Sequence, residues 1–199
     1  HYPLRRQRQM CIRDRGKSDE DKHKAHFYQA VRLVIDGVLA YAGNLSHEAD
    51  RLSQLETDSA RKRELETMRD ICARVPGEKS RTFWEALNAI WICKVALHQE
   101  NANIGLSLGR LDQILFDLYR QDIKRGMTPS EAIELVGCFW LKIADHVPLV
   151  PETGEELFGG TGSNQAVTLG GVDMHGKDVV NDLTYIMLRA TELLKLRDP

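Results

Sequence analysis

The chain has 199 residues, of which 42% are hydrophobic and 28% are charged, and its formal net charge at pH 7 is −2. These values are typical of a soluble, cytoplasmic globular protein that comprises one domain or part of one. The small net charge gives no electrostatic basis for a nucleic acid or an anionic membrane as partner, and no apolar run reaches the ~18 residues that a membrane-spanning helix needs.

The two ends of the sequence predict a fragment of a longer protein. Residues 1–16 are dense in charge and lack apolar periodicity, so they cannot bury enough surface to become ordered. The string RQMCIRDR also resembles translated sequencing-adapter read-through, and no secretory or organellar leader pattern is present. We expect residues 1–16 to be non-native or disordered and residues 17–199 to carry the fold. The sequence stops at Pro199, directly after an apolar helical pattern.

Three helices are predicted in the first half of the chain. Apolar residues at i, i+3 and i+4 spacing predict a long helix from about Ser18 to Leu55. A second, mostly polar helix is predicted over residues 58–74, where a Val-Pro-Gly sequence ends it. Ser80 or Thr82 is suited to cap a third helix, because a hydroxyl side chain accepts a hydrogen bond from the free N–H groups at a helix start. The buried face of that helix is expected to carry Phe83, Leu87, Ile90, Trp91, Val95 and Leu97.

A run of small residues from Asn103 to Gly109 interrupts the helical pattern. The segment Ile104–Leu108 is long enough for a short strand, and its flanking glycines would let a backbone or a ligand approach closely. A fourth helix is then predicted from Leu111 to Arg125, where a glycine ends it.

A fifth helix has the clearest start signal in the chain. Thr128 is predicted as N-cap, Pro129 as the first helical residue and Glu131 as the partner that closes a capping box. This helix is expected to end at about His146.

The last part of the chain predicts a loop, a strand and a helix. The glycine-rich sequence FGGTGSN is followed by Ala166–Gly170, whose alternation and β-branched residues predict a short strand. A turn is predicted at residues 173–176, and Asn181 is predicted to cap the last helix. The inward face of that helix is expected to carry Leu183, Ile186, Met187, Ala190 and Leu194. Together, these elements predict a mostly α fold with one or two short strands.

The usual patterns of catalytic and metal sites are missing. The sequence contains four cysteines: Cys11, Cys72, Cys93 and Cys138. They have no CxxC or other metal-ligand spacing, so we expect reduced, buried thiols. His98, Glu100 and His146 form no i, i+4 ligand pair with a third ligand, and we expect ordinary, satisfied histidines there. The glycine-rich loop also lacks the spacings of phosphate-binding loops. These patterns predict no metal site and no catalytic residue.

Three polar residues follow the break in the helical pattern at once: Arg110, Asp112 and Gln113. Asp112 would be favoured by the dipole at a helix start, and Arg110 is suited to a bidentate contact with a nearby carboxylate. Alternatively, the three side chains only fix the turn that leads into the helix.

Several linked motifs occur in a fixed order. They are Arg74-x-Pro76, Thr82-Phe83-x-Glu85-Ala86, Glu100-Asn101, Leu106-Ser107-x-Gly109-Arg110-Leu111-Asp112-Gln113 and Tyr119-x-x-Asp122-x-x-x-Gly126. A further motif is Gln165-x-x-Thr168-x-Gly170-Gly171-Val172-Asp173-x-x-Gly176-x-Asp178-x-x-Asn181-x-x-Thr184. Over residues 25–199 this pattern resembles the glycyl radical enzymes, the pyruvate formate-lyase-like superfamily. The resemblance implies that residues 17–199 are a partial domain, an internal slice of a large, ten-stranded α/β barrel wrapped by helices.

The resemblance also implies a chemistry. In this family a glycyl radical, installed by a radical-SAM activating enzyme, abstracts hydrogen from a cysteine, and the thiyl radical attacks a small-molecule substrate in a sealed barrel. The family cysteine and the RVxGY-like glycine motif would both lie beyond residue 199, and Cys72, Cys93 and Cys138 do not match the cysteine. The fragment alone is therefore expected to be inactive and partly molten or aggregating. Family likeness further implies a homodimeric parent in an oxygen-avoiding cytoplasm.

The subclass is expected to be a dehydratase, decarboxylase or lyase that cleaves a C–C, C–O or C–N bond. Formate acetyltransferases tend to show Gly-Arg followed by Thr-Ser-Thr, whereas here Gly109-Arg110 is followed by Leu-Asp-Gln. Diol-dehydrating members often carry polar side chains where this chain has Ile104-Gly105, which disfavours glycerol or propanediol as substrate. Hydroxyproline dehydration and arylacetate decarboxylation remain candidates, as does a C–S lyase.

The resemblance and the alternation of a strand together predict a site. Asn103, Gly105 and Ser107 would line the substrate pocket, or Ile104 if the register is shifted by one. Glu100, Arg110, Asp112 and Gln113 are predicted as structural anchors. A different class of protein stays open as the alternative: a self-contained helical interaction module without catalysis.

Overall fold

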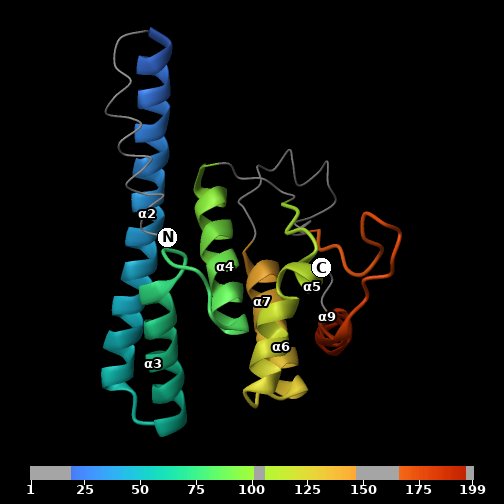
Figure 1. Cartoon of the computed structure of the whole chain (residues 1–199). Coiled ribbons are helices and arrows are strands. Elements are labelled where there is room, and N and C mark those ends of the chain that lie inside the picture. Colours follow the sequence, from blue (N-terminus) through green and yellow to red (C-terminus); the bar gives the residue numbers. More distant parts are fainter. Residues whose placement is uncertain (1–18, 101–105, 147–165, 196–199) are drawn as a thin grey trace, which may run out of the picture.

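The computed structural model describes residues 19–100, 106–146 and 166–195. Most of the described residues are helical. The helices are α2 (Asp19–Leu55), α3 (Ser59–Arg74), α4 (Phe83–Glu100), α5 (Leu111–Ile114), α6 (Phe116–Lys124), α7 (Pro129–Asp145) and α9 (Asp182–Leu194). Figure 1 shows an antiparallel pair, α2 and α3, beside a second group of helices that runs from α4 to α9.

The two helices predicted first are confirmed as α2 and α3, which pack together as a hairpin. Asp58 caps α3 by accepting a hydrogen bond from the Ala60 N–H at 2.8 Å. On α2 the buried positions that face inward carry small residues, Ala42, Ser46, Ala49 and Ser53. Because these side chains are short, α3 can approach closely, and Ser46 Oγ donates a hydrogen bond to the Arg69 carbonyl at 2.9 Å. The N-terminal half of α2 extends past the end of α3 (Figure 1).

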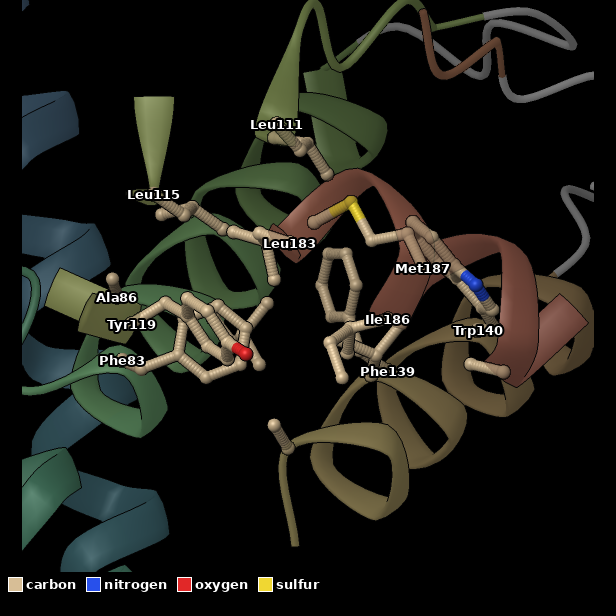
Figure 2. Close-up of a cluster of buried hydrophobic side chains, with 14 of the residues drawn as sticks. Phe83, Ala86, Leu111, Leu115, Tyr119, Phe139, Trp140, Leu183, Ile186 and Met187 are labelled. Carbon is tan, nitrogen blue, oxygen red and sulfur yellow. The ribbon is translucent and has the colours of Figure 1, made fainter. Parts of the chain in front are cut away.

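The main core lies between α4, α5, α6, α7 and α9 (Figure 2). Phe83 at the start of α4 is fully buried, and its ring meets the Tyr119 ring edge-on with centroids 5.9 Å apart. Leu183 and Met187 of α9 are fully buried as well. Burying each large apolar side chain contributes roughly 1.5–3 kcal/mol to stability. The predicted inward face of the last helix is therefore confirmed.

The helix starts that local signals predict are confirmed. Thr82 rather than Ser80 accepts a hydrogen bond from the N–H of Glu85 at the start of α4. At α7, Thr128 Oγ1 accepts from the Glu131 N–H at 3.2 Å, while the Glu131 carboxylate accepts from the Thr128 N–H at 2.7 Å. Asn181 and Thr184 form the same reciprocal box at α9. These caps depend only on neighbours in sequence, and this makes them predictable.

The fourth predicted helix is divided. Its residues form α5 and α6, which meet at a bend at Leu115, a buried residue with φ −99° and ψ −7°. The Leu115 N–H still bonds the Leu111 carbonyl at 2.9 Å, and its own carbonyl accepts from the Tyr119 N–H at 3.0 Å. Leu115 belongs to the main core, and neither glycine nor proline lies at the bend, so we attribute the bend to tertiary packing.

Two predictions of burial are wrong. Cys93 and Cys138 are exposed, and only Cys72 among the described cysteines is buried. Leu97, expected on the buried face of α4, is 55% exposed. In each case an apolar run is wider than the face that packs, so its outermost side chains stay outside.

The described residues of the two segments predicted as strands lie next to each other, and one bridge forms just after the first segment. Gly109 pairs with Val167 in parallel. The Leu108 N–H donates to the Ala166 carbonyl at 3.0 Å, and the Thr168 N–H donates to the Gly109 carbonyl at 3.2 Å. An isolated parallel pair has no further neighbour to extend it, so it stays short in the described part of the chain. A second, antiparallel bridge joins Val172 to Asp178 and closes the predicted turn.

Candidate functional site

The predicted pocket residues fall partly outside the described residues. Asn103, Ile104 and Gly105 lie outside them, and Ser107 lies inside. Ser107 is exposed, whereas its neighbour Leu108 packs against the core. Successive side chains of an extended segment point to opposite sides, so Ser107 faces away from the core. Glu100 is the last residue of α4.

Arg110 binds the backbone of the segment that follows the Gly109–Val167 bridge. Its guanidinium donates hydrogen bonds to the Val172 carbonyl at 3.1 Å and to the Gly170 carbonyl. The expected carboxylate partner is thus replaced by two carbonyl oxygens. Gly170 and Gly171 have φ of +61° and +84°, a conformation that glycine adopts without strain. The turn through these glycines brings both carbonyls within reach of one guanidinium.

Asp112 is fully buried and joins three parts of the chain. Its Oδ2 accepts hydrogen bonds from the Gly170 N–H at 2.7 Å and from the Thr184 hydroxyl at 2.6 Å. Its backbone carbonyl accepts from the Asn181 side-chain amide at 3.1 Å. The other carboxylate oxygen, Oδ1, is buried and meets no donor among the described residues. A buried carboxylate is costly unless donors surround it, so these contacts hold α5 to the start of α9.

Gln113 adds a further contact between α5 and the segment that follows the glycine turn. Its amide donates to the Val179 carbonyl at 2.8 Å, and the Val179 N–H in turn donates to the Gly171 carbonyl at 3.0 Å. We call the set Arg110, Asp112, Gln113, Asn181 and Thr184 the anchor cluster. It fixes the segment that leads out of Ser107 against the glycine turn at residues 170–171.

Two members of the anchor cluster were not predicted as such. Asn181 and Thr184 were recognisable only as a helix cap and a motif position, and their contacts with Asp112 span 69 and 72 residues of sequence. The sequence feature that could have linked Asn181 and Thr184 to Asp112 is that their motifs occur in the same ordered set. Sequence spacing alone gives no distance between such remote residues.

A second polar group fixes the start of α4. Asp122 accepts a hydrogen bond from the Phe83 N–H at 2.7 Å and contacts Arg125 at 2.9 Å. Glu85, which is 4% exposed, accepts from the Arg81 backbone N–H at 2.6 Å and from the Arg81 guanidinium at 2.8 Å. Burial raises the pKa of Glu85, but the hydrogen bonds from Arg81 outweigh it, and the pKa lies below its ordinary value. Asp122 and Glu85, both motif residues, therefore position the start of α4.

The described residues contain no group of three or more His, Cys, Asp and Glu side chains that could hold a metal ion. Within the same ranges, no helix is long and apolar enough to cross a membrane. The glycine-rich loop at residues 158–164 lies outside them.

Comparison with known proteins relates this arrangement to a family. A family model described as pyruvate formate lyase-like matches residues 4–199. An isethionate sulfite-lyase of Nitratidesulfovibrio vulgaris is 38% identical over 184 residues, which cover 90% of this chain and 22% of that protein. A (2S)-3-sulfopropanediol dehydratase of Klebsiella oxytoca is 30% identical, with 88% of this chain and 22% of that protein covered.

A solved structure has the same fold. The crystal structure of a glycyl radical enzyme from Archaeoglobus fulgidus superimposes with a TM-score of 0.89 at 39% identity, over 96% of this chain and 25% of that chain. The chain thus spans about a quarter of the length of its relatives, and its helices are a slice of the glycyl radical enzyme barrel. Because the family model covers nearly all of the sequence, the chain belongs to the pyruvate formate lyase-like family, that of the glycyl radical enzymes.

Proposed function

We propose that the chain is an internal segment of a glycyl radical enzyme that cleaves a bond in a small molecule, and that this segment forms one wall of the substrate pocket. The anchor cluster carries the proposal. It ties the backbone after Ser107 to the glycine turn and Val172 through Arg110 and Asp112, and to Val179 through Gln113. Held in this way, the preceding residues can present side chains at fixed positions.

The wall of the pocket is proposed to carry Asn103, Gly105 and Ser107, or Ile104 in the shifted register. Ser107 is exposed and faces away from the core, as a pocket residue would. Its hydroxyl can both donate and accept a hydrogen bond and is suited to a polar substrate group. Glycine at position 105 would leave room for a ligand next to the backbone.

In the complete protein, a glycyl radical installed by a radical-SAM activating enzyme would supply the hydrogen abstraction that starts the reaction. We place both the radical glycine and the reactive cysteine beyond residue 199, so this segment contributes substrate binding and exclusion of water. The segment alone would then be inactive. We further propose a homodimeric protein in an oxygen-poor cytoplasm.

The substrate that we propose first is a small sulfonate. The relatives described above are named for isethionate and for (2S)-3-sulfopropanediol, and both are anionic sulfonates. The reaction would be cleavage of a C–S bond with release of sulfite, or dehydration of a C–O bond. Glycerol is a poorer candidate, because it lacks the anionic sulfonate group that isethionate and (2S)-3-sulfopropanediol share.

The test uses the protein encoded by the complete reading frame, activated without oxygen by its radical-SAM enzyme. We expect a glycyl radical signal in electron paramagnetic resonance and sulfite release from isethionate, with glycerol unchanged. Ser107→Ala is expected to lower turnover roughly tenfold, the loss of one good hydrogen bond, at an unchanged radical yield. Ser130→Ala, at an exposed position of α7, is the matched control and should behave as wild type.

Three results separate the parts of the proposal. Equal turnover of wild type and Ser107→Ala would remove Ser107 from the pocket. A radical signal with no turnover of either sulfonate would overturn the substrate class. Failure of the activated complete protein to form any glycyl radical would overturn the function itself.

A further inference from the structure

A group of basic side chains lies at the C-terminal ends of α4 and α7, away from the anchor cluster. The two helices pack against each other and run in the same direction in Figure 1. Lys94 and His98 lie one turn apart on α4, and His146 is the C-cap of α7. The His98 and His146 rings are stacked with centroids 5.2 Å apart. We call Lys94, His98 and His146 the basic cluster.

The most buried member is Lys94, which is 1% exposed. Its ammonium nitrogen has no hydrogen-bond partner among the described residues and lies 5.5 Å from the centroid of the Trp91 ring. Lysine is rarely buried without an acceptor, because an ammonium group loses several kcal/mol of hydration in a protein interior. The face of one indole ring returns only about 2 kcal/mol of that loss.

His98 is likewise buried without a hydrogen-bond partner among the described residues. It is 9% exposed, and both of its ring nitrogens are buried without a partner among the described residues. The described residues therefore do not satisfy His98, contrary to the expectation of an ordinary, satisfied histidine. A neutral imidazole carries one donor and one acceptor, and a charged one carries two donors. Three donor-bearing groups thus lie close together, and Lys94 and His98 have no hydrogen-bond partner among the described residues.

Positive charge predominates among the described side chains around the basic cluster. Burial lowers the pKa of Lys94. Burial and then the charge of Lys94 lower the pKa of both His98 and His146. Among the described residues, an acidic side chain that raises a pKa in this cluster is Asp145, which is exposed and acts on His146. Lys142 adds a further positive charge on α7, 5.4 Å from the centroid of the Trp91 ring.

We propose that the basic cluster binds an oxyanion group, a carboxylate or a sulfonate, phosphate or sulfate of similar size. An oxyanion accepts several hydrogen bonds at once, and its negative charge would balance the positive charge of Lys94. A metal cation would not fit, because an ammonium group has no lone pair to donate and repels positive charge. Neutral ligands would leave the Lys94 charge uncompensated. This proposal does not rest on the proposed function.

The oxyanion has two possible sources: a free small anion, or an acidic side chain of the complete protein. A crystal structure of the complete protein grown with sodium selenate distinguishes them, because selenium is located by its anomalous scattering. A selenium peak within hydrogen-bond distance of Lys94 Nζ identifies a free oxyanion site. An Asp or Glu carboxylate at the same place identifies the internal source. Only water, carbonyl or hydroxyl oxygens around Nζ would overturn the proposal.

Calorimetric titration with sulfate, at an ionic strength held constant with chloride, gives an independent readout. For a free oxyanion, we expect saturable binding that Lys94→Met weakens by roughly tenfold or more, since a charge-assisted hydrogen bond is lost. Lys142→Met is the matched control, an exposed lysine beside the same tryptophan, and should change the affinity by less than about twofold. For an internal carboxylate, wild type should bind no sulfate, and Lys94→Met should lower the thermal midpoint. Equal weakening by both variants would show a diffuse positive field and refute the specific site.

Discussion

At the scale of single residues, the side chain that matters most to the candidate site is Asp112, which is fully buried. It fixes where the glycine turn and the start of α9 lie relative to α5, through two hydrogen bonds to Oδ2 and one to its carbonyl. A residue of this kind acts on function by positioning others. Its removal should therefore change local opening before it changes the overall fold.

We predict that Asp112→Ala loosens the segment from residue 166 to residue 181. The Gly170 N–H and the Thr184 hydroxyl lose their shared acceptor, which costs about 2 kcal/mol and corresponds to roughly 30-fold faster amide exchange. Hydrogen exchange read by mass spectrometry measures this change in the peptides that cover the segment. Asp112→Asn keeps one carbonyl oxygen for both donors and should show much less of the effect. Equal exchange in wild type and Asp112→Ala would mean that the contact contributes nothing.

A second prediction at this scale concerns the pH dependence that Glu85 confers. Its pKa is lower in the folded chain, so its contribution is present at neutral pH and is lost as the pH falls below about 4.3. In Glu85→Gln the charge-assisted contacts with Arg81 are weakened at every pH. We expect urea midpoints that lie below wild type at pH 7 and converge toward wild type in acid. If the urea midpoints of the two proteins fell in parallel as the pH is lowered, Glu85 would not be the source of this pH dependence.

At the scale of elements, the glycine turn at residues 170–171 forms one side of the candidate site. Arg110, just before α5, and Asp112, within α5, bind this turn, and Gln113 binds the chain that follows it. The backbone of the turn is left-handed at both glycines. Only glycine takes this conformation readily, so the turn depends on its sequence more than the helices around it do.

We predict that Gly170→Ala is more harmful than Gly176→Ala. Both positions have positive φ, +61° and +77°, so both variants suffer a backbone cost of roughly 1–2 kcal/mol. At position 170 the new methyl group would also lie 2.9 Å from Val180 Cγ2, whereas position 176 is open. Hydrogen exchange of the turn measures both variants, and Val180→Ala in the Gly170→Ala background should recover the steric part only. Equal loosening by the two single variants would exclude the steric contribution.

The elements also show what a sequence can predict. The capped helices follow from neighbouring residues, and Thr128 with Glu131 identifies the start of α7 without further knowledge. The bend at Leu115 depends on the core, and the outward position of Cys93 depends on which face of α4 packs. The partners of Arg110 lie 60 and 62 residues away. No local pattern contains such distances, so the sequence indicates that Arg110 is an anchor but not what it holds.

At the scale of the whole molecule, the N-terminal half of α2 carries an apolar surface that the described residues leave uncovered. Phe27 is 63% exposed, Leu33 65% and Val34 53%. These residues belong to the N-terminal half of α2, the half that extends past α3 (Figure 1). Large apolar side chains exposed in this way mark a place where another part of a protein packs.

We predict that the isolated chain binds the dye ANS and that the complete protein binds much less. Leu33→Lys should reduce dye fluorescence and aggregation of the isolated chain, because it places a charge within the apolar surface. Met174→Lys is the control, since Met174 is 90% exposed in the turn and far along the chain from α2. Fluorescence that stays the same in Leu33→Lys would place the dye elsewhere and refute the assignment.

The span of the Asp112–Thr184 contact affects the order of assembly during synthesis. The two residues are separated by 72 positions, so the carboxylate leaves the ribosome long before its hydroxyl partner exists. At 5–20 residues per second the delay is roughly 4 to 14 s. Throughout that interval α5 has no fixed neighbour at this end, and the nascent chain must keep a future interior charge in water. The wall of the candidate pocket is therefore among the last features of this segment to take shape, even though its residues are translated near the middle.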